Sequence, residues 1–231
     1  MHDPLPTIMD NRVDGSGGGL ENAYTATTKL ILSTVSGNRA SRGGGIDLGT
    51  FFMNLPNSIE SYGTTIANNT ATVAGGGGGV RLIGAVGGAL GTTTVFVAHN
   101  TILADNPGGN VSIGLIYSYL FSRGHNLSSD TTTADFTESG DRNGVDPLLS
   151  PLANNGGPIP THALQPGSPT IDASTCVAPQ IFAPPPINRD QRGTLRPQRN
   201  TCDIGSFEFV FRASALATAH AQAQVGGTAT P

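Results

Sequence analysis

The stretch LSTVSGNRASRGGGI, residues 32–46, joins a short alternating apolar run to a Gly-Asn turn and three consecutive glycines. Related segments recur at residues 63–69 and 100–106. In each segment an aliphatic residue is followed by a small residue, a turn-forming residue and an asparagine. The aliphatic positions are Val35, Ile66 and Leu103, and the asparagines are Asn38, Asn69 and Asn106. The chain therefore contains an internal repeat.

The repeat has an irregular period, because its asparagines recur after 31 residues (69 − 38) and then after 37 (106 − 69). Periods of this size are typical of solenoids. The runs between glycines and asparagines are short and β-rich, without a useful helical period. We therefore predict an all-β fold, a parallel β-helix of a few rungs stacked about 4.8 Å apart. The alternative is low complexity without fixed structure, although disordered segments lack such regularly placed aliphatic residues.

Each position of the repeat has an expected role in such a stack. The three aliphatic residues would form an inward-facing ladder. The three asparagines would stack at a corner, where asparagine tolerates a left-handed backbone and one amide can bond the next. The glycine runs at 17–19, 43–45 and 75–79 would supply corners and close backbone approaches that no β-carbon permits.

Changes in sequence texture divide the chain into four expected parts. Residues 1–16 are short and polar, which predicts an irregular segment, a poor cover for the first rung, and so favours a chain truncated at this end. The rungs are expected at 17–127. Residues 128–211 should form an acidic loop and an irregular Pro-rich cap over the last rung. The Ala-rich residues 212–231 are predicted to be a disordered tail.

Composition excludes several classes of protein. Charged residues make up only 12% of the 231 residues, and the net charge is −4. With no basic excess to neutralise phosphates, nucleic acid is not an expected partner. No apolar run approaches the ~20 residues of a membrane-spanning helix. No signal peptide is visible at the start, so the chain is either cytosolic or an internal piece of a longer exported protein.

Two cysteines, Cys176 and Cys202, lie in the C-terminal third. Two isolated cysteines make a poor zinc site. A disulfide between them is favoured and would indicate an oxidising compartment, whereas two unpaired thiols are the alternative. The bond would close a loop of about 26 residues, which stabilises by about 3 kcal/mol in the chain-entropy model.

Opposite charges lie close together near the C-terminus, at Arg192, Arg196, Asp203 and Glu208. Partly buried arginine–carboxylate pairs are forked and directional, so these residues are expected to hold the cap together. The alternative is a catalytic cluster that includes Asp190 and Arg192, but ion-pair networks also perturb pKa values without catalysing anything.

Two long stretches near the C-terminus resemble a known family. They are DPLLSPLANNGGPIPTHALQPGSPTIDA, residues 146–173, and RDQRGTLRPQRNTCDIGSFEF, residues 189–209. With the glycine-rich rungs and the RGHNL segment at 123–127, they are similar to the bacterial choice-of-anchor Q family over roughly residues 17–209. The resemblance implies a right-handed β-helix of the pectin-lyase-like kind, export and surface display. Sorting signals differ within that family, and residues 212–231 match none, which leaves the means of attachment open.

Residues with possible chemistry were identified in three groups. Asp141, Asp146, Asp190 and Arg192 are catalytic candidates, since polysaccharide hydrolysis needs two carboxyl groups roughly 5–9.5 Å apart. Asp141, Asn143 and Asp146 are candidate calcium ligands, although their spacing matches neither an EF-hand nor an RTX repeat. The alternative to a catalytic or calcium-binding role for residues 130–146 is a solvated loop. His99, His125 and His162 lack metal-ligand spacing and are expected to be structural.

The sequence thus favours a non-catalytic, exported bacterial surface module, adhesin-like or stalk-like, with carbohydrate as the preferred ligand class. Tyr62, Tyr117 and Tyr119 are candidates for stacking on sugars, and core packing is the alternative for the last two. A polysaccharide lyase or glycoside hydrolase is the alternative function, and a truncated gene fragment without independent function is the third. Calcium is the one metal for which the sequence offers candidate ligands, and no cofactor is expected.

Overall fold

The computed structural model describes residues 6–23, 26–49, 57–84, 93–114, 117–176 and 188–211. Within these ranges the chain is all-β, has no helix, and pairs its strands mostly in parallel. The tail predicted at 212–231 lies outside the described residues, as do the first five residues of the segment 1–16.

The largest sheet is parallel and has six strands in the order β1-β4-β8-β12-β15-β16. Its strands are short because each ends at a turn residue with positive φ or at a small polar residue. The strands are β1 (Thr7–Met9), β4 (Thr34–Ser36), β8 (Thr65–Ala67), β12 (Ile102–Ala104), β15 (Leu127–Ser128) and β16 (Arg142–Asn143).

Two further parallel sheets have four strands each, in the orders β13-β10-β6-β2 and β14-β11-β7-β3. The first contains β2 (Leu20–Ala23), β6 (Ile46–Gly49), β10 (Val80–Ile83) and β13 (Val111–Ile113). The second contains β3 (Thr27–Ile31), β7 (Asn57–Tyr62), β11 (Thr94–His99) and β14 (Ser118–Ser122). A small parallel pair is formed by β5 (Arg39–Ala40) and β9 (Thr70–Ala71).

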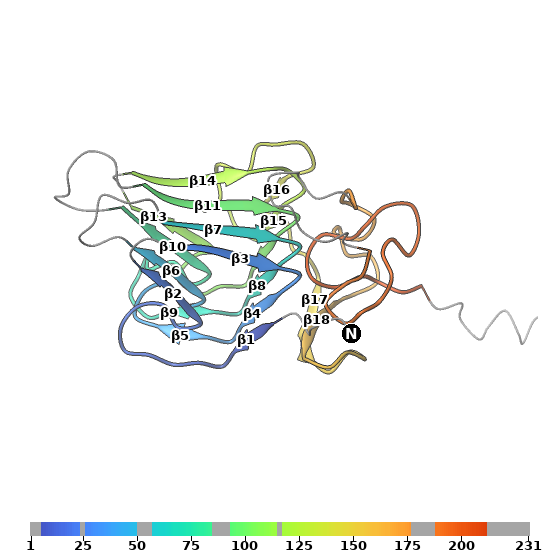
Figure 1. The fold of residues 1–231 in the computed structure, drawn as a ribbon, viewed down its shortest axis with the longest axis horizontal. Coiled ribbons are helices and arrows are strands. Elements are labelled where there is room, and N and C mark those ends of the chain that lie inside the picture. Colours follow the sequence, from blue (N-terminus) through green and yellow to red (C-terminus); the bar gives the residue numbers. More distant parts are fainter. Residues whose placement is uncertain are drawn as a thin grey trace, which may run out of the picture.

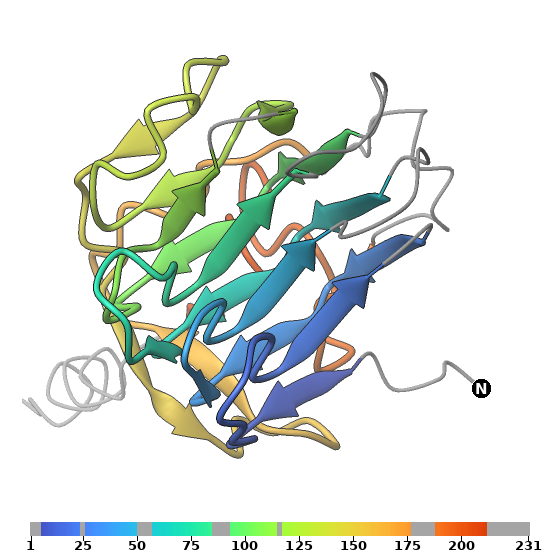
Figure 2. The same ribbon diagram turned by 90° about the vertical axis from the view of Figure 1, so that its left-hand side faces the viewer.

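From β1 to β15 the chain visits the three large sheets in a fixed rotation, and each return pairs in parallel with the strand of the preceding visit. We call one such visit to all three sheets a coil. Figure 1 shows the strands of one sheet side by side, and Figure 2 shows the coils following one another in chain order. This arrangement is compatible with the predicted β-helix.

The interior of the stack contains the three aliphatic residues of the repeat. Val35 pairs in register with Ile66, and Ile66 with Leu103, and all three are fully buried. They pack with inward residues of the other two sheets, such as Leu48 and Phe96. One continuous apolar core therefore runs through successive coils, as expected when identical positions of each repeat share one interior.

The three asparagines form a buried hydrogen-bonded column. Asn38 Nδ2 donates to Asn69 Oδ1 at 2.9 Å, and Asn69 Nδ2 donates to Asn106 Oδ1 at 3.1 Å. The asparagine column also explains the glycine runs. A β-carbon at Gly19, Gly45 or Gly79 would lie 2.9 Å from a side-chain atom of Asn38, Asn69 or Asn106, respectively. Only glycine admits the column, so the glycine and asparagine positions of the repeat depend on each other.

Two predicted boundaries are corrected. The segment 1–16 is not wholly irregular, because β1 pairs with β4 and Arg12 and Ser16 form bridges to the next coil. The parallel sheets also continue beyond residue 127, since β16 pairs with β15. The parallel pairing of the large sheets thus begins at Thr7 and ends at Asn143, because backbone hydrogen bonds do not need the repeat's sequence pattern to form.

The acidic segment, residues 129–141, is largely exposed, as a solvated loop would be, but it inserts one apolar residue into the end of the stack. Phe136 is 2% exposed and belongs to the main core. The Asp130 carboxylate accepts hydrogen bonds from the backbone N–H groups of Asn110 and Thr132. The acidic side chains therefore order the backbone that places Phe136, and an apolar plug closes the last coil.

The Pro-rich C-terminal module, residues 144–211 where described, lies beside the stack, not over its last coil as predicted (Figure 1). It begins with an antiparallel hairpin of β17 (Leu149–Ala153) and β18 (Thr161–Leu164). Gln191 accepts from Thr34 Oγ1 on one coil, and the backbone of Ser206 donates to Thr65 Oγ1 on the next. Ile204 and Phe207 pack with the outward residues of the six-stranded sheet. The physical reason is that β4, β8 and β12 are buried on both faces, so their outer face needs a cover.

Candidate functional site

Two exposed aromatic side chains lie next to each other on β14. Tyr119 and Phe121 are 43% and 48% exposed, and their rings lie 5.8 Å apart between centroids with an angle of 6° between their planes. Alternation along the strand turns Leu120 inward, where it is buried, and both rings outward. We call Tyr119 and Phe121 the aromatic shelf. Exposed aromatic residues side by side on a rigid sheet are typical of a binding surface.

A groove of about 340 Å³ adjoins the aromatic shelf. Its walls are β14 and the acidic segment, which contributes Asp135, Thr137 and Glu138. The groove therefore combines apolar ring surface with carboxylate and hydroxyl oxygens that can accept hydrogen bonds. Its depth depends on the acidic segment, whose position is fixed by the Phe136 plug.

The three tyrosines predicted to stack on sugars differ in how exposed they are. Tyr119 belongs to the shelf. Tyr62 cannot serve, because it is 1% exposed and stacks on His99 at 5.1 Å, and burial raises the pKa of Tyr62 to about 12. Tyr117 is partly buried and precedes β14 with a positive φ. Sequence reasoning missed Phe121, although its spacing of two residues from Tyr119 on a strand places both rings on one face.

A row of charged residues crosses the sheet β13-β10-β6-β2. Glu21, Asp47 and Arg81 occupy one register position on three neighbouring strands. Arg81 Nη1 lies 3.2 Å from Asp47 Oδ1. Burial raises the pKa of Asp47 to about 6, against the opposing effect of Arg81, and the negative charge of Glu21 raises it further. Sequence reasoning missed this row, since only the parallel register brings residues of three different coils together.

Asp190 and Arg192, the predicted catalytic candidates of the module, are engaged in structural contacts. Arg192 Nη2 lies 2.7 Å from the buried Asp190 carboxylate, and the Arg192 guanidinium covers the Phe207 ring at 3.5 Å. The same carboxylate accepts backbone N–H groups of Thr194 and Glu208. Both carboxylate oxygens of Asp190 accept hydrogen bonds from groups of the module. Few lone pairs of this carboxylate therefore remain to contact a substrate.

Asp141, Asn143 and Asp146 do not meet at one point. Asp141 accepts from the backbone N–H groups of Asn126 and Glu138, and so shapes the turn. Asn143 donates to the Phe136 carbonyl, and Asp146 accepts from the Leu148 N–H. Among the described residues, no group of three or more histidine, cysteine, aspartate or glutamate side chains is arranged to hold a metal ion.

The predicted network of the module is brought together around Arg196. Its Nε lies 3.4 Å from the Glu208 carboxylate, and its Nη2 donates to the Gly205 carbonyl at 2.8 Å. Glu208 in turn accepts from the Asp203 N–H. Burial raises the pKa of Asp203 to about 7, and the negative charge of Glu208 raises it further. Cys176 and Cys202 form the predicted disulfide, which is confirmed.

The three histidines join segments of backbone. His162 lies 2.8 Å from Ser36 Oγ through Nε2 and 2.8 Å from the Ser150 carbonyl through Nδ1. Burial lowers the pKa of His162, which favours the neutral ring. His125 Nδ1 contacts the Ala173 carbonyl, and His99 Nδ1 contacts the Arg123 carbonyl.

Comparisons with protein-family models, curated proteins and solved structures find no match to this chain. No helix long and apolar enough to cross a membrane occurs in the part of the chain that the structure describes.

Proposed function

We propose that the coils form a right-handed parallel β-helix and that the protein is a non-catalytic carbohydrate-binding module of an exported bacterial surface protein. The cyclic order of strands and their in-register parallel pairing support the β-helix, since crossovers between parallel strands of one sheet are right-handed almost without exception. The sequence resemblance to choice-of-anchor Q proteins supports an adhesin-like or stalk-like role.

The observation that carries the proposal is the aromatic shelf beside a groove with carboxylates. Sugars have apolar C–H faces and polar hydroxyl edges, so they suit a site that offers ring surface on one side and hydrogen-bond acceptors on the other. Tyr119 and Phe121 supply the rings, and Asp135, Thr137 and Glu138 supply the oxygens. Because β14 belongs to a packed sheet, the shelf needs no ordering when a ligand binds.

Export is supported by the disulfide and by the family resemblance. Disulfides persist in oxidising compartments and are rare in reducing ones. The bond between Cys176 and Cys202 lies within the module that resembles the family's conserved end. A surface role for a rigid stack is also consistent with a core that is shared by successive coils.

The proposal is tested by affinity electrophoresis of the whole chain in gels that contain a panel of neutral and acidic polysaccharides. At least one polysaccharide should retard the protein. Tyr119→Ala and Phe121→Ala should each weaken that retention by about tenfold, because a buried aromatic contact contributes on the order of 1–3 kcal/mol. Ile113→Ala is the matched control, since Ile113 is 36% exposed on a different sheet. Unchanged retention in both aromatic variants, or binding of extended peptides instead of glycans, contradicts the proposal.

A second candidate function, a polysaccharide lyase or glycoside hydrolase, is favoured by the row Glu21, Asp47 and Arg81. Carboxylates that converge with an arginine are what such chemistry needs, and a carboxyl group with a pKa of about 6 can exchange protons near neutral pH. Asp47, however, has no exposed surface. Unsaturated product absorbing in the ultraviolet, or new reducing ends, formed by the wild type and lost in Asp47→Asn, would favour the enzyme over the binding module.

A further inference from the structure

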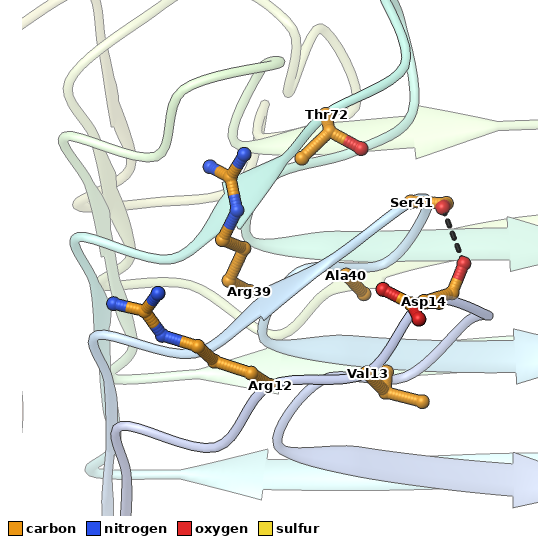
Figure 3. Close-up of a pocket in the computed structure, with 7 residues that line it drawn as sticks. All are labelled: Arg12, Val13, Asp14, Arg39, Ala40, Ser41 and Thr72. Atoms are coloured by element: carbon orange, nitrogen blue, oxygen red, sulfur yellow. Dashed lines mark hydrogen bonds between the residues drawn. The ribbon is translucent and has the colours of Figure 1, made fainter.

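Two arginines of successive coils stand side by side at one turn of the stack. Arg12 and Arg39 form a parallel β-bridge, held by hydrogen bonds from the Val13 N–H to the Arg39 carbonyl and from the Arg39 N–H to the Asn11 carbonyl. Parallel register places their α-carbons one strand spacing apart, about 4.8 Å. Figure 3 shows both guanidinium groups extending in the same direction, one above the other.

The pair lines a groove of about 400 Å³, to which Asp14, Ser41 and Thr72 also contribute. Among the described residues, neither guanidinium lies within 4.0 Å of a carboxylate. The ion pairs in this part of the chain are formed by Lys29 and by other arginines. The Ser41 hydroxyl donates to the Asp14 carbonyl, which fixes the wall of the groove (Figure 3). Both arginines are exposed at the groove mouth.

Like charges directly opposite on neighbouring strands repel each other. Here the backbone register imposes the pairing, and an anion between the two side chains would offset the repulsion. A guanidinium presents N–H donors in a planar fork that matches the oxygens of a carboxylate or sulfate group. One oxyanion can therefore accept hydrogen bonds from both arginines at once and relieve their mutual repulsion.

We propose that Arg12 and Arg39 form a binding site for an oxyanion, a carboxylate or sulfate group, carried on an extended polysaccharide. The open groove and the exposed hydroxyl of Thr72 suit a charged group attached to a larger chain with further hydroxyls. The site uses the first coils, whereas the aromatic shelf uses β14 of the last one. The two sites are therefore independent, and either proposal can fail without the other.

The test uses three polymers with one backbone: dextran, carboxymethyl dextran and dextran sulfate. Binding of the whole chain to each is measured by calorimetry at low salt. Arg12→Gln and Arg39→Gln should each weaken binding to at least one charged polymer by about tenfold, because charge-assisted hydrogen bonds are lost. The double variant should lose less than the product of the two single losses, since both side chains hold one group. Comparing the two charged polymers distinguishes carboxylate from sulfate.

Arg42→Gln is the matched control, because Arg42 is exposed, lies three residues from Arg39 and does not line the groove. It removes the same charge and should change affinity less than about twofold, since only the general electrostatic attraction is reduced. Asp14→Asn should strengthen binding by removing a negative charge from the groove. Equal losses in the Arg12, Arg39 and Arg42 variants, or no binding of either charged polymer, would overturn the proposal. Thermal unfolding of each variant verifies that it is folded.

Discussion

At the scale of single residues, asparagine and glycine determine how the coils fit together. The side chain of Asn69 uses all its hydrogen-bonding capacity without water. Its Nδ2 shares two hydrogens among three acceptors, the carbonyls of Val35 and Ala67 and Asn106 Oδ1, and its Oδ1 accepts from the backbone and side chain of Asn38. The column thus satisfies backbone groups that the tight corner leaves without strand partners.

Replacing Asn69 with alanine should lower the free energy of unfolding by about 2–4 kcal/mol, because several buried polar groups lose their partners at once. Urea denaturation followed by circular dichroism measures the loss. Asn68→Gly is the control: Asn68 is exposed with a φ of 59°, a backbone conformation that glycine adopts freely. Equal stability of the two variants would show that the column contributes nothing specific.

Residue chemistry also explains which sequence-based expectations succeeded. The register of Val35, Ile66 and Leu103 was predictable, because an aliphatic residue at a fixed distance from a turn must face the same way in each repeat. Tyr62 was assigned wrongly to the surface. A tyrosine at the end of an alternating strand gives no sign of whether a histidine from the next coil will stack on it.

At the scale of elements, the acidic segment has the role that the Pro-rich module was expected to have. Its carboxylates point at backbone N–H groups, which is the usual way to order a turn without regular pairing. Its one large apolar residue, Phe136, then enters the end of the core. This role was not predicted from the sequence, because a segment rich in acidic residues suggests a solvated loop.

Phe136→Ala should therefore destabilise the protein by about 3–5 kcal/mol, since it leaves a cavity at the end of the core. Hydrogen exchange should accelerate first in β13, β14 and β15, the strands of the last coil. Phe121→Ala removes the same ring from an exposed position and should cost about 1 kcal/mol or less. Wild-type stability of the Phe136 variant would mean that another element closes this end.

At the scale of the whole molecule, the stack and the module share a second core. Ile204 and Phe207 of the module pack with Ala67, Ile102 and Leu127 on the outer face of the six-stranded sheet. Hydrogen bonds from Thr34 and to Thr65 tie the same surfaces together. Each part covers apolar surface that the other would expose to water, so the two should unfold together.

The pH dependence of stability belongs to this scale, because raised carboxyl pKa values occur in both parts. The pKa of Asp203, in the module, is raised to about 7, and that of Asp47, in the stack, to about 6. Above the ordinary value near 4, the unfolded chain releases these protons while the folded protein retains them. Stability should therefore fall as the pH rises from about 4 to about 7, by up to about 1.4 kcal/mol per pH unit for each group.

Urea midpoints measured across that pH range check the prediction. Asp203→Asn should flatten the upper part of the curve, whatever its effect on absolute stability. Two lowered pKa values act in the opposite sense. That of Asp130, caused by hydrogen bonds that outweigh its burial, acts only below about pH 4, and that of the buried His162 acts only as the pH approaches its ordinary value of 6.5. A stability that rises steadily from pH 4 to pH 7 would contradict the assignment of Asp203 and Asp47 as buried acids.

The all-β class, the repeat, the aliphatic and asparagine ladders and a favoured pairing of Cys176 with Cys202 could all be predicted from the amino-acid sequence. These features are local or periodic, so the spacing of residues along the chain contains them. In contrast, the place of the module beside the stack, the closure of the stack by Phe136 and the bridge between Arg12 and Arg39 become visible in three dimensions alone. Such contacts depend on which coils lie next to each other and which faces remain uncovered, and that information exists only once backbone hydrogen bonds have set the register between distant segments.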